Sequence, residues 1–279
     1  MNDFMNSKQI LIFLLSLLIG IFSSQSWAWG PEGHQTTGYI AQSLLTPEAR
    51  VRLNQIMPGV DLGQVATWMD DERNVLKKTI PGSAQWHFYN LPVCDSKPKK
   101  DICAKGNCAV SKIDEYAQVL VSPNASNQDK VFALRVIVHV VGDLHQPLHA
   151  GDNDDRGGNK IKVGEHTNLH SEWDHAFVKK LAKGKSSKSL ADELKIKYSD
   201  DMKGWQSGDP LSWADESNQF ARSVAYGKLP GFSCNETYLF VEKLPSSYID
   251  DSQLVVEKRL AMGGARIAYV LNTSLTKPK

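Results

Sequence analysis

The segment from Phe132 to Val141 limits the possible folds most, because it is almost entirely apolar and long enough for a buried helix. We predict a helix over Gln128–Gln146 that Pro147 ends. His139 and Asp143 are four residues apart on this helix, so their side chains project from one side. Burying such groups is costly unless hydrogen bonds or a metal ion satisfy them. The chain must therefore fold around a polar site inside an apolar interior.

Helical spacing recurs along most of the remaining chain, which predicts a mainly α fold. The other predicted helices cover residues 39–57, 65–75, 111–121, 170–183, 188–199, 211–226 and 251–271. Residues 158–163 alternate briefly between apolar and polar, which predicts a short β-hairpin. No linker rich in proline, glycine or serine and no repeat divides residues 29–279, so we expect a single compact multi-helix domain.

The first 28 residues have the parts of a secretory signal peptide. Lys8 supplies positive charge, an apolar run covers residues 10–22, and Ser26-x-Ala28 is a cleavage signal of small residues. The apolar run is shorter than the about 20 residues of a membrane-spanning helix, so an anchor or core helix is the less favoured alternative. Cleavage after Ala28 predicts a secreted or periplasmic protein that begins at Trp29. Its amine and carbonyl could then chelate a metal ion.

Four cysteines, Cys94, Cys103, Cys108 and Cys234, allow three full pairings. An even number in an oxidising compartment is typical of disulfides. A Gly-Asn turn before Cys108 favours the pair Cys103–Cys108 and leaves Cys94 for Cys234. A cysteine zinc site is the alternative, which the absence of any C-x-x-C unit disfavours.

The formal net charge of +1 is close to neutral. It argues against a broad basic surface of the kind that coats duplex nucleic acid. A cleft containing metal ions stays possible, because bound cations supply positive charge that side chains lack.

More histidines and aspartates accompany the pair on the long helix. His170 and Asp174 repeat the four-residue spacing, His149 follows the long helix, and Asp70 and His87 precede it. Neutral imidazole and carboxylate groups are common zinc ligands. A single buried histidine is more often structural. Two such pairs together favour a metal site, because without metal several costly polar groups would be buried.

In their order along the chain, these residues resemble the trinuclear-zinc single-strand nucleases of the S1/P1 type. The motifs that carry the resemblance are Trp29-Gly30 with His34, Trp68-x-Asp70, His87-Phe88, His139-x-x-Gly142-Asp143 with Gln146-Pro147-Leu148-His149, Gly157-Gly158-Asn159, and His170-x-x-Trp173-Asp174. The C-terminal third matches only by its helical character and Cys234. The resemblance implies a nuclease domain over residues 29–279, with a fold related to zinc phospholipase C.

The resemblance also implies three zinc ions. One would be bound by Asp70, His87, His139 and Asp143, a second by Trp29, His34 and Asp143, and a third by His149, His170 and Asp174. Asp143 would be the bridging catalytic ligand, because two closely spaced ions hold a hydroxide nucleophile between them. The third ion would stabilise the leaving oxygen.

The implied reaction is hydrolysis of P–O3′ bonds in RNA and single-stranded DNA to 5′-phosphate products, together with removal of phosphate from 3′-nucleotides. Phe88 matches a residue that stacks on a base, with core packing as the alternative. Asn90 and His175 are further candidate substrate contacts. We expect a monomer with no stable membrane association after signal cleavage.

Two other functions are compatible with the ligand pattern. Zinc-dependent phospholipases C use a similar metal arrangement, but they have glutamate where this chain has Asp174 and lack the element Gly157–Asn159. A secreted zinc-binding protein without catalysis would keep the ligands but fill every coordination position.

Overall fold

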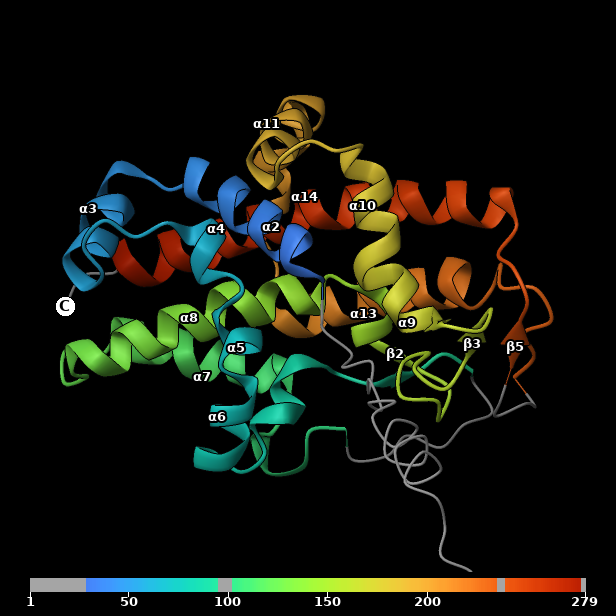
Figure 1. Cartoon of the computed structure of the whole chain (residues 1–279). Coiled ribbons are helices and arrows are strands. Elements are labelled where there is room, and N and C mark those ends of the chain that lie inside the picture. The colour runs from blue at the N-terminus through green and yellow to red at the C-terminus, as the bar shows by residue number, and fades with distance from the viewer. Residues whose placement is uncertain (1–28, 95–101, 235–238, 277–279) are drawn as a thin grey trace, which may run out of the picture.

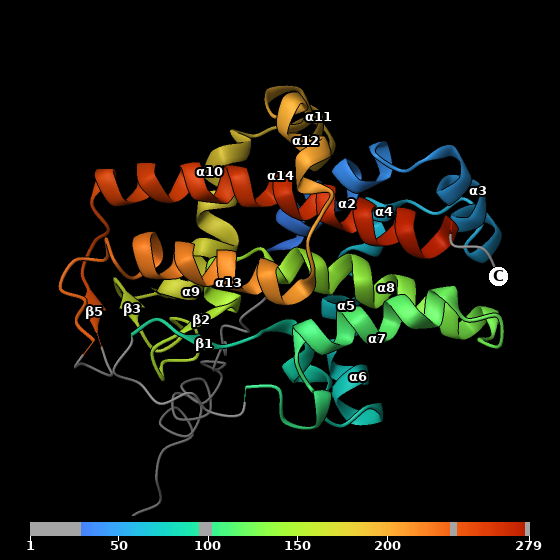
Figure 2. The same ribbon diagram turned by 180° about the vertical axis from the view of Figure 1, so that it is seen from behind.

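The structure is a computed structural model that describes residues 29–94, 102–234 and 239–276. The predicted signal peptide, residues 1–28, lies outside the described residues. The fold is mainly α, as predicted. Its longest helix is α14 (Ser246–Thr276), which runs across the molecule beside α8 (Asn127–Leu144) (Figures 1 and 2). Helix α8 also packs against α7 (Ala109–Val121), which contacts α14 and α13 (Pro210–Phe220) as well.

The central helix α8 follows the apolar pattern of the sequence. Ser126 begins it with a capping box, in which its hydroxyl accepts the N–H of Asp129 and the Asp129 carboxylate accepts the N–H of Ser126. Every residue from Val136 to Leu144 is buried. His139 and Asp143 are thereby held within the interior of the fold.

The prediction of one helix over residues 39–57 is wrong, because this part of the chain is divided between two helices. The first, α2 (Pro31–Ser43), begins well before the predicted start, and α3 (Pro47–Ile56) follows a break at Thr46. Thr46 caps α3 through its side chain, and proline at the first position cannot continue a preceding helix. Within α2, position 38 requires glycine, because a Cβ there would be 2.3 Å from the carbonyl oxygen of Leu62.

Short helical segments complete the fold. They are α4 (Leu62–Val65), α5 (Trp68–Asp71), α6 (Arg73–Thr79), η2 (Ser83–His87), η3 (Ala104–Gly106), η4 (Pro147–His149), α9 (Leu169–Ser171), η5 (Glu172–Ala176), α10 (Phe177–Ala182), α11 (Ser187–Lys197), α12 (Ser199–Trp205) and η6 (Ala221–Ala225). The helix predicted over residues 65–75 is thus divided, and α12 was not predicted. Both η5 and η6 are π-helical turns, which are frequent near functional sites.

The strands are short and gather at one end of the molecule (Figures 1 and 2). The predicted hairpin is present, although its first strand, β3 (Lys162–Val163), is shorter than predicted. It pairs antiparallel with β4 (Thr167–Asn168) and parallel with β5 (Phe240–Val241). A separate pair joins β1 (Leu91–Pro92) in parallel to β2 (Gly151–Asp152).

Two apolar clusters fill the interior. Helices α2 and α14 contribute to both, with Ile40 and Leu260 in the first cluster and Ala41 and Ile267 in the second. The ligand-bearing α2 is therefore held between the clusters rather than on one of them.

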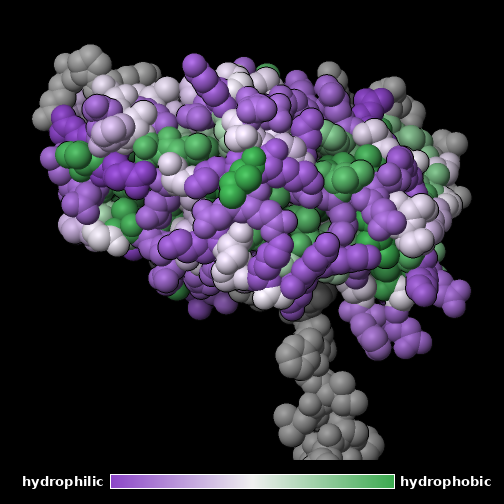
Figure 3. Space-filling view, turned by 90° about the horizontal axis from the view of Figure 1, so that it is seen from above, coloured by the Kyte–Doolittle hydropathy of each residue, from purple (hydrophilic) through white to green (hydrophobic). Residues whose placement is uncertain are grey.

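Two disulfides join the pairs that the sequence favoured, Cys94–Cys234 and Cys103–Cys108. The first links the end of the segment containing β1 to the chain before β5. No described helix has both the length and the apolar character needed to cross a membrane. The face drawn in Figure 3 is mainly hydrophilic, with its hydrophobic side chains in separate small groups.

Candidate metal centre

The predicted ligand side chains converge where α2 meets α8 and the short segments near its C-terminal end. Three groups have ligand atoms that all lie within 4.8 Å of one another: His34, His139 and Asp143; Asp70, His87 and His139; and His149, His170 and Asp174. None of these eight residues is more than 6% exposed. The fold therefore brings together side chains from positions 34 to 174 in a buried polar site.

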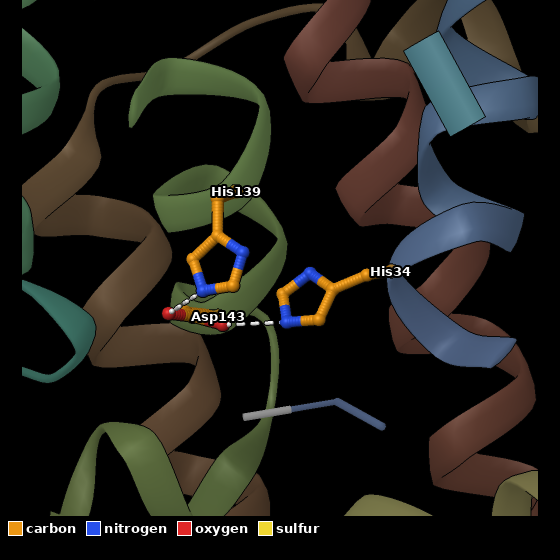
Figure 4. A group of neighbouring side chains, drawn as sticks. All are labelled: His34, His139 and Asp143. Carbon is orange, nitrogen blue, oxygen red and sulfur yellow. Dashed lines mark ion pairs between the residues drawn. The ribbon is translucent and has the colours of Figure 1, made fainter. Parts of the chain in front are cut away.

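Asp143 lies between histidines from different segments (Figure 4). Its Oδ1 is 3.1 Å from Nε2 of His34, while its Oδ2 is 3.2 Å from Nε2 of His139 and 2.9 Å from Nδ1 of His87. Asp70 approaches the same histidines, with one oxygen 3.9 Å from Nε2 of His34 and the other 3.9 Å from Nε2 of His139. The two oxygens of Asp143 thus face different neighbours, as a bridging ligand requires.

The third group has a contact that direct hydrogen bonding does not explain. Nε2 of His149 lies 3.1 Å from Nε2 of His170, which lies 3.3 Å from Oδ2 of Asp174. Each ring donates from Nδ1 to a main-chain carbonyl, His149 to that of His87 at 2.6 Å and His170 to that of Gly157 at 2.5 Å. In the neutral rings both Nε2 atoms then carry lone pairs that face each other. A cation between them would satisfy both.

Several buried ligand atoms have no hydrogen-bond partner. They are Oδ1 of Asp70, Oδ1 of Asp143, Oδ2 of Asp174 and both ring nitrogens of His34. Although Nε2 of His34 and Oδ1 of Asp143 are close, they form no hydrogen bond. Leaving such atoms unsatisfied is costly. Because the donors are nitrogen and oxygen without thiolate, the residues fit zinc or a similar divalent ion.

The electrostatics of the third group also fit a metal ion. Burial lowers the pKa of His149 to about 4, and burial together with the neighbouring His149 lowers that of His170 to about 3. Both imidazoles are neutral at pH 7, which is the form that binds metal. Burial raises the pKa of Asp174 well above its usual range. A cation beside Asp174 would favour its ionised form.

Around Asp143, neighbouring charges outweigh burial in setting the pKa values. Burial lowers the pKa of His139, but the charges of Asp143 and Asp70 outweigh burial and raise it to about 9. Burial raises the pKa of Asp143, but the charge of His139 and hydrogen bonds from His139 and His87 hold it well below its usual range. His139 donates from Nδ1 to the carbonyl of Ala66 at 2.7 Å, so Nε2 is the atom that faces the carboxylates. A metal ion can take the place of the proton on this nitrogen.

Trp29, the predicted first residue after cleavage, is fully buried in the first apolar cluster. The N–H of Gly30 donates to the carbonyl oxygen of Asp174 at 2.8 Å, and the carbonyl of Gly30 accepts the N–H of His34 at 3.1 Å. These bonds fix the main chain next to Trp29 between two ligand-bearing segments.

Phe88 and Asn90, two of the predicted substrate contacts, follow the predicted ligand His87. Phe88 is half-buried and packs against neither apolar cluster, whereas Tyr89 packs against the second. The backbone is extended at Phe88 (φ −146°, ψ 162°), so the side chains of Phe88 and Tyr89 point to different sides of the segment. The N–H of Tyr89 donates to the carbonyl of His149 at 2.7 Å and holds the segment beside the site. This arrangement favours substrate contact over core packing for Phe88.

His175, the third predicted substrate contact, is half-buried against Gly30. A Cβ on Gly30 would lie 2.1 Å from Nδ1 of His175, so only glycine allows the ring to approach this closely. Burial lowers the pKa of His175, although the charge of Glu32 opposes this effect. The imidazole therefore lies beside the main chain that follows Trp29.

Three residues near the site had no role assigned from the sequence. Gln146 is fully buried and donates to Oδ1 of Asp174 at 2.6 Å, which leaves Oδ2 to face the third group. Arg73 carries a positive charge that lowers the pKa of Asp174 against the effect of burial. His145 is fully buried and hydrogen-bonded to Arg266. The sequence offered a signal for Gln146, which belongs to the motif containing His149, and for His145, a histidine close to the predicted ligands for which a supporting role and a surface position were both open. It offered none for Arg73.

The chain matches the S1/P1 Nuclease family over residues 29–276. It belongs to this family. Similar proteins include Nuclease S1 of Aspergillus oryzae (strain ATCC 42149 / RIB 40), which is 33% identical over 91% of this chain and 94% of its own length. Endonuclease 3 of Arabidopsis thaliana is 33% identical over 88% of each chain, and Nuclease P1 of Penicillium citrinum is 31% identical over 88% of this chain and 97% of its own.

As a member of the S1/P1 nuclease family, the chain is a hydrolase of phosphodiester bonds. Family membership favours the nuclease over the phospholipase C alternative. The three groups of histidine and aspartate are the part of this member that can bind metal ions.

Proposed function

We propose that the processed chain is a zinc-dependent nuclease that hydrolyses P–O3′ bonds of single-stranded DNA and RNA to 5′-phosphate products, and that it also dephosphorylates 3′-nucleotides. The observation that carries the proposal is the set of three buried histidine and aspartate groups in a member of the S1/P1 nuclease family. Nucleic acids and 3′-nucleotides would be its substrates.

Three zinc ions would be held by the chain's own ligands. The ligands assigned to the first ion are Asp70, His87, His139 and Asp143, and those assigned to the second are the Trp29 amine and carbonyl with His34 and Asp143. The third ion is assigned to His149, His170 and Asp174, whose ligand atoms lie together in the structure. When bound, these ions supply a water activated as the nucleophile between two of them and positive charge for the phosphate oxygens. Asp143 is assigned the bridge because each of its oxygens faces a different histidine.

Residues outside the ligand set would orient the substrate. Phe88 is assigned to stack on a base, a contact that tolerates any sequence. Asn90 lies two residues after Phe88 and would donate or accept hydrogen bonds to the nucleotide. His175 would contact the substrate beside Gly30.

Processing would complete the site. Cleavage after Ala28 would free the amine of Trp29, so the ligand set would be complete only in the secreted or periplasmic protein. The two disulfides are consistent with an oxidising compartment. We also propose that the processed protein is a monomer without stable membrane association.

The test compares the purified processed chain with Asp143→Asn and, as a control, with Asp200→Asn on the exposed face of α12. Each protein is incubated with single-stranded DNA, RNA and a 3′-nucleotide, with and without chelator, and product ends are determined. We expect 5′-phosphate ends for the wild type and for Asp200→Asn, and loss of zinc and activity for Asp143→Asn. A zinc-loaded wild type that leaves all three substrates intact would instead support the non-catalytic alternative.

A further inference from the structure

The ring of His170 is oriented by a hydrogen bond to a main-chain carbonyl group. His170 lies in the first turn of the helical segment that α9 begins, and its Nδ1 donates to the carbonyl of Gly157 at 2.5 Å. This bond sets the rotation of the ring, and therefore the direction of Nε2 toward His149 and Asp174. Whatever holds Gly157 in place also holds the ligand atom of His170.

Gly157 lies in a loop whose backbone would not hold this path unaided. Asp154 and Arg156 have φ angles of 62° and 61°, which residues other than glycine adopt at a cost. Gly157 and Gly158 also have positive φ. A Cβ on Gly157 would lie 2.2 Å from the carbonyl oxygen of Leu148, so the loop passes very close to the segment that carries His149. Side chains must therefore hold the loop against that segment.

Two aspartates of the loop do so. Oδ1 of Asp152 accepts the N–H of Gly157 at 2.9 Å and that of Asp155 at 3.1 Å. Oδ1 of Asp155 accepts the N–H of Gly158 at 2.7 Å and the hydroxyl of Tyr226 at 2.7 Å. The last bond leaves the loop and attaches it to the C-terminal part of the chain.

Tyr226 is a rigid anchor for this bond. It directly follows the π-helical turn η6, its ring is only 1% exposed, and it belongs to the first apolar cluster. Asp155 is also 1% exposed, and burial raises its pKa to about 6 while the bonds from Gly158 and Tyr226 oppose that rise. The carboxylate is therefore mainly ionised at pH 7 and needs both donors.

We propose that Tyr226 and Asp155 are positioning residues that fix His170 through the carbonyl of Gly157, and thereby set the affinity of the third zinc site. This inference rests on the proposed function, because the zinc assigned to His149, His170 and Asp174 is part of it. Neither residue touches the metal ligands directly. Through Tyr226, the C-terminal third of the chain supports the site, although it carries none of the sequence motifs.

The experiment measures zinc content by native mass spectrometry, and zinc affinity by competition with a chelator, for the processed wild type and Tyr226→Phe. We expect the weakest-bound zinc of Tyr226→Phe to have a Kd about tenfold higher, in the range known for residues that orient metal ligands. The matched control is Tyr198→Phe, which loses a hydroxyl bond of 2.6 Å to Glu257 away from the site. It should lose stability without losing zinc affinity.

A further pair of variants separates positioning from general stability. In a His170→Ala background, adding Tyr226→Phe should change zinc affinity no further, because the residue on which it acts is gone. Asp155→Asn serves as a second test if Tyr226→Phe does not fold. Unchanged zinc affinity in both variants would overturn the inference, as would an equal loss of zinc in Tyr198→Phe. A wild type that binds no zinc would instead refute the proposed function itself.

Discussion

Replacing Phe88 with alanine should separate substrate binding from folding. Because Phe88 packs against neither apolar cluster, its removal should change the free energy of unfolding by less than about 1 kcal/mol, compared with about 3–5 kcal/mol for a core phenylalanine. Stacking of one base on an aromatic ring contributes about 1–3 kcal/mol. At 1.36 kcal/mol for each factor of ten, kcat/KM should fall about 5- to 150-fold.

The assay measures kcat/KM on a single-stranded oligonucleotide and on a 3′-nucleotide, together with urea unfolding of each variant. Phe88→Trp keeps a ring for stacking and should retain most activity. Phe240→Ala, which removes a ring that is 52% exposed on β5, is the control for loss of a surface phenylalanine and should leave both quantities unchanged. A large loss of stability in Phe88→Ala with unchanged kcat/KM would show that the residue packs in the fold and does not bind the substrate.

Three further predictions concern processing, pH and metal. A protein that retains Ala28 should bind less zinc and have lower activity than one beginning at Trp29, as native mass spectrometry and oligonucleotide cleavage can establish; equal zinc content would contradict the role of the amine. Burial raises the pKa of Glu216, but the bonds and charges of Arg266 and Arg259 outweigh burial and lower this pKa below its ordinary value. The ionised carboxylate therefore stabilises the fold at pH values above the ordinary glutamate pKa. This stabilisation is lost as the pH falls through the lowered pKa. In urea unfolding, the free energies of unfolding of wild type and Glu216→Gln should therefore differ by a constant amount from neutral pH to about pH 5, and by less in stronger acid. A difference that grows in acid would refute the lowered pKa of Glu216. Chelation should lower the melting temperature and added zinc should restore it, because buried carboxylate oxygens lose their partners; no change in a scan of zinc-free protein would argue against the metal site.

The fold was predictable where one apolar pattern determined the element. Helix α8 is an example, because the apolar run of the sequence falls within its bounds, Asn127–Leu144. The early start of α2 was missed because Gly33 and Gly38 count against a helix. Their benefit is tertiary, since a Cβ on Gly33 would lie 2.8 Å from Cβ of Trp29. Only the folded structure shows which contacts require a glycine.

The site was predictable to the level of residue type and order. Four-residue spacing indicated that His139 and Asp143 share one side of a helix, and their oxygens and nitrogens do lie close. The main-chain carbonyls that orient the rings were not predictable, because every residue has one and the sequence does not tell which will face a histidine. The attachment of Tyr226 to Asp155 was hidden for a similar reason, since 71 residues separate the partners.

The segment from Phe88 to Cys94 is fastened at both ends. The carbonyl of His149 holds it near its start, pairing of β1 with β2 holds its middle, and the disulfide to Cys234 holds its end. Its path therefore does not depend on the identity of the side chain at Asn90. On the proposed substrate contact, exchange of the Asn90 side chain would alter base preference while the predicted metal ligands stay as they are. A small library at this position would then be a route to new specificity.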